Sequence, residues 1–325
     1  MSELTYAQAI NEGIREEMRR DPNIVVLGED VGKYGGVFGV TRGLYDEFGA
    51  ARVRDCPLNE AAIVGFAVGL AISGKAAIAE LEFMDFATFA MDPIVNQAAK
   101  IRYYWGGQVQ TPLVVRMPVA SQMGFGTQHS QSLEAWFMHV PGLKVAMPSN
   151  GYDAKGLIKT AIRDPNPVVF VENISLYATK SEIPEQEYLI PFGQAEIKRA
   201  GDDVTVVALA AMVPRALQAA EQLAQEGMSV EVIDPRTLAP LDIETIVASV
   251  EKTGRLVVAH MAHKTGGVGA EIAQQVVERA FDYLDGPVVR VAAVDAPIAA
   301  SQALEAAIYP DVQNVVEACL SFRRR

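Results

Sequence analysis

A lone carboxylate at the front of an apolar segment is the first feature of this sequence that can do chemistry. Glu60 precedes the run Ala-Ala-Ile-Val-Gly-Phe-Ala-Val-Gly-Leu, and Pro57 and Asn59 just before it are turn and capping residues. We therefore expect a helix to begin near Asn59. Glu60 then lies in the first turn, where the helix macrodipole favours a negative charge. Such an acid either caps a core helix or serves as a proton donor, and its spacing favours neither.

Two glycines indicate how this helix packs. Gly65 and Gly69 are four residues apart and share one face, and each costs about 1 kcal/mol of helix propensity relative to Ala. Close approach of another backbone usually compensates for that cost. Because a helix that is apolar all round is buried, we predict a buried helix packed tightly on a neighbour, which can be a second subunit. The apolar run 61–73 is too short to span a membrane.

The same segment resembles the aminopyrimidine-binding signature of thiamine-diphosphate enzymes. That signature is Glu, four residues, Gly, an apolar residue, two residues, Gly and an apolar residue. The chain matches it at Glu60, Gly65, Phe66, Gly69 and Leu70. The resemblance implies that Glu60 touches N1′ of the pyrimidine ring and favours the imino tautomer, whose N4′ takes the proton from the thiazolium C2. Shielding from water would help Glu60 keep its proton, because burial raises a carboxyl pKa.

Length, charge and cysteine content exclude several classes of protein. The chain has 325 residues, half of them hydrophobic, which predicts two domains with a large core. Its net charge of −12 argues against nucleic acid and against an anionic membrane surface, and it suits a partner that carries a basic patch. Cys56 and Cys319 are far apart and support neither a disulfide framework nor a zinc site. Because the N-terminus has no basic or apolar leader, we expect a cytoplasmic protein.

Alternating apolar strands and amphipathic helices predict an α/β fold in both halves of the chain. Strands are expected at 24–27, 76–81, 113–117, 168–172, 204–209, 230–234, 256–260 and 288–291. Helices are expected at 5–20, 152–163, 214–226, 243–252, 268–280 and 304–322. This alternation predicts mostly parallel sheets covered by helices on both faces. A segment rich in charged residues and proline, 173–190, is expected to be the interdomain linker.

Two further segments point to one family. His129 lies in Gln-His-Ser-Gln-Ser, which is followed by Pro-Gly-Leu-Lys-Val. These strings closely resemble the beta subunit of pyruvate-type 2-oxoacid dehydrogenases, where this His faces the thiazolium. Phe83, Phe86 and Phe89 are spaced for one side of a helix, and in relatives the ring matching Phe86 stacks on the aminopyrimidine. We include Glu29, directly after the first strand, among the cofactor-binding residues.

The chain departs from relatives at Pro93, where they usually have Gln. We expect Asp92 and Pro93 to restart the helix, with Asp as its cap and Pro at its first position. The resemblance also implies a structural potassium ion bound by backbone oxygens. Its matching positions are Leu113, Ala161, Asp164 and Asn166. An ordinary helix-to-strand turn explains the same residues, so both interpretations stay open.

The motif that binds the cofactor's diphosphate in thiamine enzymes is absent from the sequence. Those enzymes hold a divalent metal with Gly-Asp-Gly followed further on by Asn-Asn, whereas the nearest string here is Gly201-Asp202-Asp203. The resemblance therefore implies half of a site, with the diphosphate and Mg²⁺ held by an alpha subunit in a heterotetramer of two alpha and two beta chains. It divides the chain into a thiamine-diphosphate pyrimidine-binding domain at 1–185 and a transketolase C-terminal-like domain at 186–325.

The resemblance covers nearly the whole chain and implies a function. It predicts an oxidoreductase subunit that decarboxylates a 2-oxoacid, most simply pyruvate, and passes the acyl group to a lipoyl arm. Glu60 would activate the cofactor, Phe86 would position its ring, and His129 would assist substrate binding and acyl transfer. Three alternatives stay open: an acetoin or branched-chain substrate, a complete transketolase-like enzyme, and a noncatalytic flavoprotein-like or scaffold subunit. The missing metal motif opposes the second.

A second partner is implied for the C-terminal domain. In relatives a small basic domain of the acyltransferase component docks on the C-terminal domains of the beta chains, and an acid in a Leu-Asp-x-Pro string takes part. Leu284-Asp285-Gly286-Pro287 matches that string, so Asp285 is the candidate. An ordinary turn Asp before Gly-Pro explains the same residue.

Overall fold

The computed structural model describes residues 1–324 and the side chains of residues 1–323. The chain divides into two compact units. Unit 1 consists of Met1–Val119 and Trp136–Phe192, and unit 2 consists of Ala120–Ala135 and the chain from Gly193 onward. The domain boundary predicted between 185 and 186 stays a prediction. No helix in the described part of the chain is long and apolar enough to cross a bilayer.

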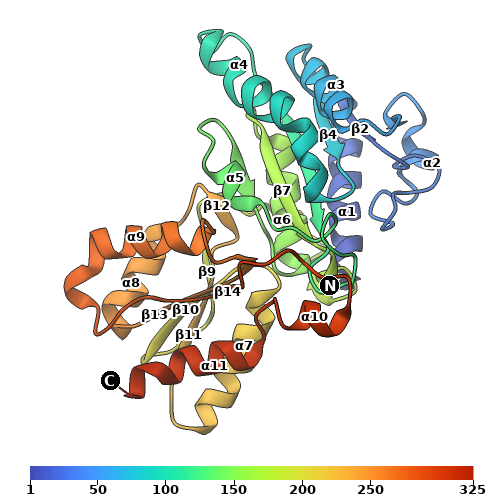
Figure 1. Cartoon of the computed structure of the whole chain (residues 1–325). Coiled ribbons are helices and arrows are strands. Elements are labelled where there is room, and N and C mark those ends of the chain that lie inside the picture. Colours follow the sequence, from blue (N-terminus) through green and yellow to red (C-terminus); the bar gives the residue numbers. More distant parts are fainter. Residues whose placement is uncertain (325) are drawn as a thin grey trace. The chain divides into compact units, whose positions relative to one another are not determined.

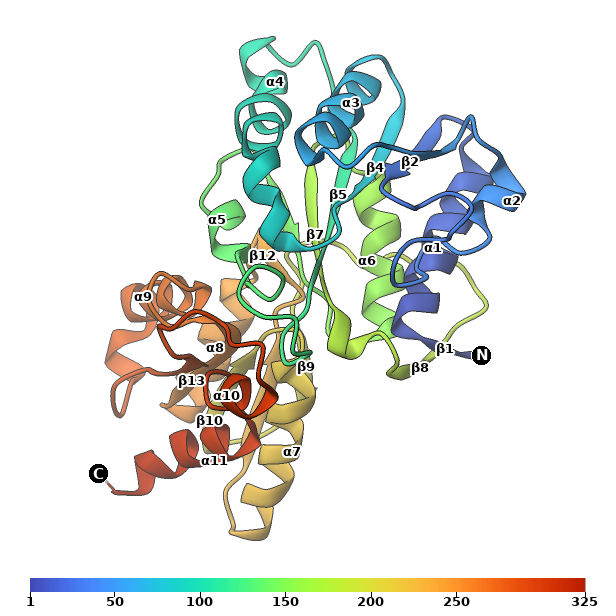
Figure 2. The ribbon, with the colours of Figure 1, turned by 45° about the vertical axis from the view of Figure 1, so that its right-hand side comes forward.

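Unit 1 is built on a parallel sheet with helices on both faces (Figures 1 and 2). Its strands lie in the order β6-β7-β5-β4-β2-β3, and each neighbouring pair is parallel. Their bounds are β2 Ile24–Gly28, β3 Val53–Asp55, β4 Ala76–Glu80, β5 Leu113–Val119, β6 Lys144–Ala146 and β7 Val168–Asn173. Strands β2, β5 and β7 are buried at every residue, as expected for strands covered on both faces.

The helices of unit 1 form two layers. Helices α1 and α6 pack against each other, and α3 packs on η1 and on η2 (Figure 2). Their bounds are α1 Tyr6–Arg20, α2 Leu44–Phe48, α3 Glu60–Ile72, η1 Met84–Ala90, η2 Asp92–Ala98, α4 Ala99–Tyr104, α6 Gly151–Arg163 and η3 Ile174–Leu176. The short helix α5, Glu134–Met138, runs from the inserted segment of unit 2 into unit 1.

Unit 2 is a second sheet between two helical layers (Figure 1). Its strands lie in the order β14-β13-β10-β11-β9, and only β9 is antiparallel. The strands of this sheet are β9 Glu196–Arg199, β10 Val204–Ala208, β11 Val230–Asp234, β13 Leu256–His263 and β14 Val289–Ala293. Unit 2 also contains the short strand β12 Thr237–Ala239. The helices are α7 Met212–Gln225, α8 Ile243–Thr253, α9 Val268–Ala280, η4 Phe281–Tyr283, α10 Gln302–Ala306, α11 Val312–Leu320 and η5 Ser321–Arg324. The prediction of α/β units with mostly parallel sheets is confirmed.

The prediction that helix α3 is buried all round is wrong within this chain. Ile63, Val64 and Ala67 face the core, whereas Phe66 is 68% exposed on the face that Gly65 and Gly69 share. A Cβ added at either glycine would meet nothing within 4 Å. Overall apolarity does not reveal which face the chain itself covers, so packing of this face on a second subunit stays a prediction.

The predicted linker is wrong as well. Within it, β8 Lys180–Ile183 pairs antiparallel with β1 Ser2–Thr5, which was not expected as a strand. The pairing follows from burial, because Ile183 is fully buried. Charged residues elsewhere in the segment lie on its exposed side and gave it the composition of a linker.

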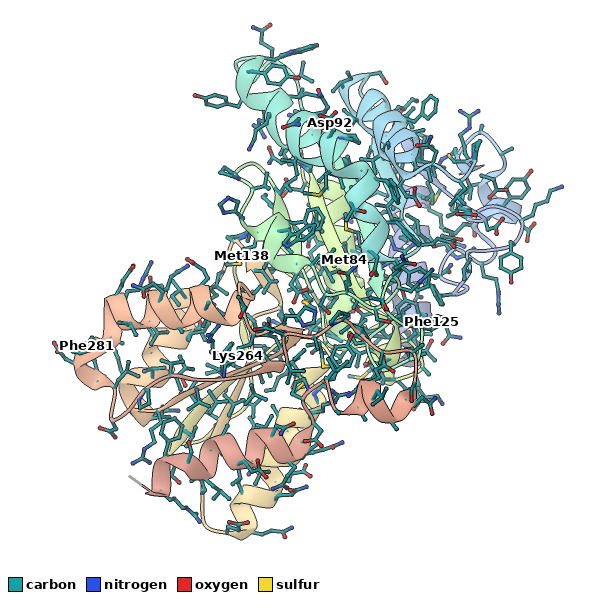
Figure 3. All side chains as sticks on the ribbon, viewed as in Figure 1. Met84, Asp92, Phe125, Met138, Lys264 and Phe281 are labelled. Carbon is teal, nitrogen blue, oxygen red and sulfur yellow. The ribbon has the colours of Figure 1, made fainter. Side chains whose placement is uncertain are left out.

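Two helix predictions fail at prolines. The expected helix 304–322 is two helices, because Pro310 lacks the amide hydrogen that a continuous helix needs and Asp311 starts α11 with a capping box. Pro93 is the second residue of η2 and not its first as predicted, because the N-cap is Met91 and Asp92 is already helical. The carboxylate of Asp92 instead accepts a hydrogen bond from the Asn96 amide. Figure 3 labels Asp92, the first residue of η2.

The three phenylalanines do not share one buried side. Phe83 lies before η1 and is 9% exposed, Phe86 is half-buried, and Phe89 is 68% exposed. Phe83 differs because it precedes the 3₁₀ helix η1 and has a non-helical φ of +145°. Phe86 and Phe89 are three residues apart within η1 and share one side of it, but the rest of the chain covers only the Phe86 ring in part.

Candidate active site

Acidic side chains gather at the carboxyl edge of the sheet in unit 1. Glu29 and Asp30 follow strand β2, Glu82 follows strand β4, and Glu60 opens helix α3. Strands β2 and β4 are parallel neighbours with Gly28 opposite Glu80, so the residues after both strands emerge at the same edge. In open parallel sheets this edge is where ligands bind.

The carboxyl groups at this edge change one another's affinity for protons. Burial raises the pKa of Glu29, and the charges of Asp30 and Glu60 raise it further. Burial, followed by the charges of Glu80, Glu29 and Asp30, raises the pKa of Glu82 to about 8. One carboxyl oxygen of Glu82 is buried without a hydrogen-bond partner. Glu82 therefore holds a proton at neutral pH, which lowers the negative charge of the cluster.

Glu82 and Asp30 were missed as site residues by sequence reasoning. A signal was available, because each lies two residues past the end of a short apolar strand. What the sequence does not reveal is that strands β2 and β4, which are about fifty residues apart, are neighbours in the sheet.

A buried ion network lies beneath this edge. Arg116 of strand β5 donates through Nε and Nη2 to the two carboxylate oxygens of Glu172, at 2.7 and 2.9 Å, and through Nη1 to Glu80. The Tyr177 hydroxyl donates to the same Glu172 at 2.7 Å. All four side chains are at least nine-tenths buried. A bidentate guanidinium satisfies two carboxylates that would otherwise be costly to bury.

Glu60 is positioned by a well-formed helix start. The side chain of Asn59 accepts a hydrogen bond from the amide of Ala62 at 3.0 Å, and its carbonyl accepts one from Ile63 at 2.9 Å. The predicted cap is therefore confirmed. Helix α3 packs on η1, which carries Phe86.

The ring of Phe86 belongs to a chain of aromatic contacts. It meets Phe83 edge to face, with centroids 6.2 Å apart and planes at 77°. Phe83 in turn meets Phe38, from the glycine-rich loop after strand β2, at 5.6 Å and 82°. Through these T-shaped contacts, Phe83 packs against the half-buried Phe86 ring and holds it in place.

These residues fit the aminopyrimidine part of thiamine diphosphate. A half-buried aromatic ring offers a surface for stacking, and neighbouring acids with raised proton affinity suit a ring nitrogen that accepts a proton. The fit does not extend to the diphosphate's metal: in residues 1–324, no three His, Cys, Asp or Glu side chains are arranged to hold an ion.

His129 lies on the loop between strand β5 and helix α5, as predicted, but this loop belongs to unit 2. Its side chain is half-buried and its amide donates to the carbonyl of Gly126 at 3.4 Å. The structure therefore brings Glu29 and Glu60 together in unit 1, whereas His129 and Asp285 belong to unit 2. The catalytic and binding roles of these residues stay predictions.

The predicted potassium positions form a hydrogen-bonded turn. Asp164 caps helix α6, pairs with Lys144, and accepts hydrogen bonds at 2.9 Å from both the backbone and the side-chain amide of Asn166. The carbonyl of Ala161 accepts the Asp164 amide at 3.2 Å, and Leu113 begins strand β5. These bonds account for the turn, and the ion stays a prediction.

Asp285 lies at an exposed turn of unit 2. Its amide donates to the carbonyl of Gly254 at 2.8 Å, and its carboxylate is 3.9 Å from Arg255. The side chain is 65% exposed, so it is accessible to a partner.

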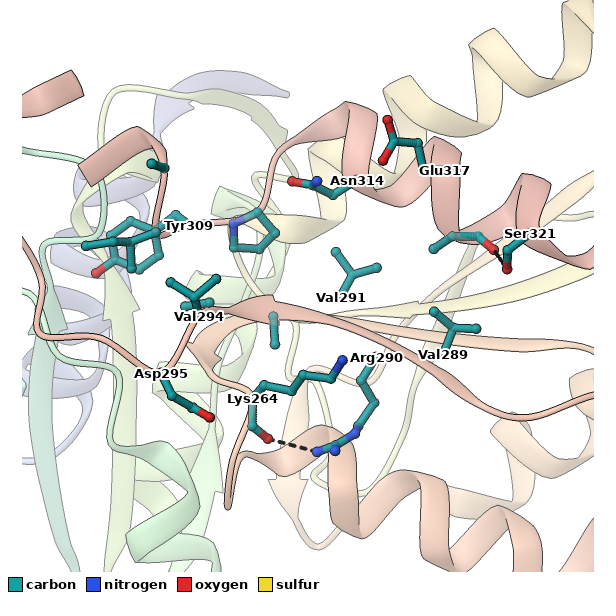
Figure 4. A pocket seen from close by; sticks show the side chains of 16 residues that line it. Lys264, Val289, Arg290, Val291, Val294, Asp295, Tyr309, Asn314, Glu317 and Ser321 are labelled. Carbon is teal, nitrogen blue, oxygen red and sulfur yellow. Dashed lines mark hydrogen bonds between the residues drawn. The ribbon is translucent and has the colours of Figure 1, made fainter. Parts of the chain in front are cut away.

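Among the hollows outside this site, one is apolar and one is lined by charged residues. An apolar groove of about 490 Å³ runs along the exposed face of helix α3 in unit 1. In unit 2 a cavity of about 650 Å³ lies between strand β14 and helix α11 (Figure 4). Lys264, Arg290, Asp295 and Glu317 give its walls both signs of charge. Its lining contains none of the predicted site residues.

Comparison with known proteins first defines the class. Residues 2–180 match the family "Transketolase, pyrimidine binding domain", and residues 193–315 match "Transketolase, C-terminal domain". A solved structure, "Split gene transketolase, inactive beta4 tetramer", is similar with a TM-score of 0.81 and 25% identity over 98% of this chain and 97% of that chain. The chain is thus a two-domain protein of the transketolase type.

Sequence relatives narrow this class. The chain is 45% identical over 320 residues to "Pyruvate dehydrogenase E1 component subunit beta-2, mitochondrial" of Oryza sativa subsp. japonica, covering 97% of this chain and 85% of that one. It is 44% identical over 318 residues to "Pyruvate dehydrogenase E1 component subunit beta" of Bacillus subtilis, covering 98% of both. The chain belongs to the family of pyruvate dehydrogenase E1 beta subunits.

Proposed function

We propose that this chain, with an alpha subunit, forms the thiamine-diphosphate-dependent E1 component of a pyruvate dehydrogenase complex, as a tetramer of two alpha and two beta chains. The observation that carries the proposal is the packing of helix α3, which begins with Glu60, on η1, which bears Phe86. Both lie on the unit whose sheet edge gathers the acids. The names of the relatives support the same function.

Each site residue then has a distinct task. Glu60 holds N1′ of the pyrimidine, and Phe86 stacks against the ring. Burial and the charges of Asp30 and Glu60 raise the pKa of Glu29, so Glu29 favours a proton at this edge. When bound, the cofactor supplies the carbon nucleophile and accepts the electron pair that decarboxylation leaves behind. The alpha subunit holds Mg²⁺ and the diphosphate, and backbone oxygens at the α6 turn hold K⁺.

His129 is assigned to substrate binding and to transfer of the acyl group to a lipoyl arm. An imidazole can both accept and donate a proton, which suits this role. We expect His129→Ala to lower lipoyl-dependent turnover much more than it lowers the yield of assembled tetramer. Unchanged activity per tetramer, together with poor assembly, would assign His129 a structural role.

The exposed face of helix α3 is assigned to contact with a neighbouring subunit. Gly65 and Gly69 leave open space along the apolar groove of helix α3, and the Phe66 ring is exposed. Leucine at Gly65 would fill the space that an approaching helix needs, so Gly65→Leu should reduce tetramer yield in size-exclusion chromatography. Ala224→Leu, at an exposed position of helix α7 in unit 2, is the control.

The substrate is tested on the assembled pair. The two chains and the acyltransferase component are supplied with pyruvate, acetoin or 3-methyl-2-oxobutanoate, and kcat/KM is compared. Pyruvate should have the highest value. Preference for another compound would move the enzyme to a sister complex, and no turnover of any of them by a folded tetramer would favour a noncatalytic subunit. The cytoplasmic location stays a prediction, since some relatives are named mitochondrial.

A further inference from the structure

The loop that carries His129 is fixed by side chains of unit 2. It leaves strand β5 at Val119, and its residues Ala120–Ala135 cluster with unit 2. We propose that Tyr309 is a positioning residue for His129, acting through the carbonyl of Ser130, and that Arg215 and Glu305 fix the earlier part of the same loop. The inference rests on the proposed role of His129.

Tyr309 makes the contact nearest to His129. Its hydroxyl donates to the carbonyl of Ser130 at 2.7 Å, across 179 residues of sequence. Tyr309 is 4% exposed, and its amide donates to the carbonyl of Glu305 at 3.2 Å. The following Pro310 restricts the backbone. The phenol is therefore a rigid donor that holds the residue directly after His129. Figure 4 shows the Tyr309 ring at one end of the unit 2 cavity.

Arg215 holds the beginning of the loop. Its guanidinium donates to the side-chain oxygen of Gln122 and to the carbonyl of Pro310, the latter at 2.9 Å. Burial lowers the pKa of Arg215. Gln122 has a φ of +62°, in the left-handed region that side chains other than Gly rarely adopt. Such a conformation persists where its surroundings enforce it, and here Arg215 of helix α7 does so.

Glu305 and two glycines hold the middle of the loop. The carboxylate of Glu305, 2% exposed, accepts the amide of Gly124 at 2.9 Å. Gly124 and Gly126 both have positive φ values, and a Cβ on Gly126 would come within 3.2 Å of Ala300. The loop thus runs close to the chain before helix α10. Three side chains of unit 2 anchor it, at residues 122, 124 and 130. Phe125, labelled in Figure 3, is 44% exposed between these anchors.

These anchors matter because catalytic groups depend on small displacements. Loss of the Tyr309 hydroxyl would leave a carbonyl beside His129 without its donor and let the loop relax. The imidazole would then sample more orientations. The sequence gives no sign of the contact between Tyr309 and Ser130, because the two residues are 179 positions apart.

The test is a double-mutant cycle on the enzyme assembled with its alpha subunit. Tyr309→Phe removes only the hydroxyl, and we expect lipoyl-dependent kcat to fall roughly 3- to 10-fold, the worth of a hydrogen bond. In a His129→Ala background the same change should have no further effect. The matched control is Tyr6→Phe, because the buried Tyr6 donates to the carbonyl of Pro148 at 3.3 Å in unit 1. Its effect, whatever its size, should be the same in both backgrounds.

Amide hydrogen exchange supplies a readout that does not depend on activity. Exchange in the peptide 122–130 should quicken in Tyr309→Phe and stay unchanged in Tyr6→Phe. Unchanged exchange in Tyr309→Phe, or a Tyr309→Phe effect that multiplies with that of His129→Ala, would overturn the inference. If His129→Ala turns over normally, the proposed role of His129 fails, and with it the positioning role. Faster exchange would then leave Tyr309 with a purely structural role.

Discussion

The two units share an architecture and differ at the carboxyl edges of their sheets. In unit 1, strand β4 ends in Glu80, and Glu29 and Glu82 follow strands β2 and β4. In unit 2, the central strand β10 ends in Ala208 and continues through Leu209 and Ala210, which are buried and apolar. Strand β11 of unit 2 also ends in an acid, the buried Asp234. The difference therefore lies in the central strand β10, which ends in apolar packing where strand β4 of unit 1 ends in Glu80.

The helices that follow these edges differ in the same way. Helix α3 is capped by Asn59 and begins with an acid, whereas α7 has no side-chain cap and begins with Met212. Ala210 before it has a φ of +43°, so the turn into α7 is tight. Parallel α/β architecture creates the edge, and the residues placed there decide whether it does chemistry. In unit 2 the architecture instead anchors a loop.

The largest effect is expected from removing the cation beneath the charged edge. Arg116→Met leaves Glu80 and Glu172 buried without their partner, so the free energy of unfolding should fall by about 3–5 kcal/mol. Denaturant titration measures it. Arg19→Met removes an exposed pair with Glu47 and serves as the control, which should lose no more than about 1 kcal/mol. An equal loss of unfolding free energy in both variants would show that the buried ions stabilise unit 1 no more than an exposed ion pair does.

The next effect concerns catalysis at the same edge. Glu60→Gln keeps the shape and removes the ionisable proton, so kcat of the assembled enzyme should fall at least about 100-fold while cofactor binding survives. Glu244→Gln is the matched control, since Glu244 lies in the first turn of helix α8 in unit 2. Near-normal turnover of the folded Glu60→Gln enzyme would reduce Glu60 to a helix-start residue like Glu244.

A smaller effect is expected from the uncompensated acid of the inserted loop. Glu134 is fully buried, neither carboxyl oxygen has a hydrogen-bond partner, and burial raises its pKa from the ordinary 4.5 to about 7. The folded chain therefore binds more protons than the unfolded chain between these values, and stability falls as pH rises through them. Between pH 5 and 7 the loss should be about 2 kcal/mol.

Thermal and denaturant unfolding at several pH values measure this dependence. Glu134→Gln should remove it, and Glu221→Gln, at an exposed site on helix α7, should preserve it. A wild-type stability that stays flat from pH 5 to 7 would contradict the burial of an uncompensated carboxyl.

The smallest effect is expected on the outer surface of unit 2. Asp285→Lys should weaken binding of a basic acyltransferase domain, and added salt should weaken it further, because exposed charges are screened. Surface plasmon resonance at two salt concentrations measures both. Asp282→Lys, an exposed neighbour on η4, is the control. Binding that is indifferent to salt and to Asp285 would place the docking surface elsewhere.

Much of the fold was predictable where the signal was local. Strand β11 and helix α9 have the predicted bounds, and Asn59 caps α3 as expected. Predictions failed where structure was inferred from composition alone, because composition does not reveal which strands pair. The segment 173–190 has the composition of a linker, yet within it β8 pairs with β1, which lies at the start of the chain.

The sequence proposed the candidate site one residue at a time. Glu60, Phe86 and His129 follow from the family resemblance, and Glu29 follows from its place after a strand. The raised pKa of Glu82 and the anchoring of the His129 loop were not predictable. Both depend on which distant segments become neighbours, as the 2.7 Å bond between Tyr309 and Ser130 illustrates.

The sequence by itself determined the family, the α/β class and the start of the helix that carries Glu60. Those features depend on residue types within a few positions of one another, through capping, periodicity and a short signature. Only the tertiary structure decided that Arg116 bridges Glu80 and Glu172 and that unit 2 holds the His129 loop. Burial changes the energy of a charge or a hydrogen bond, and burial is a property of the packed chain.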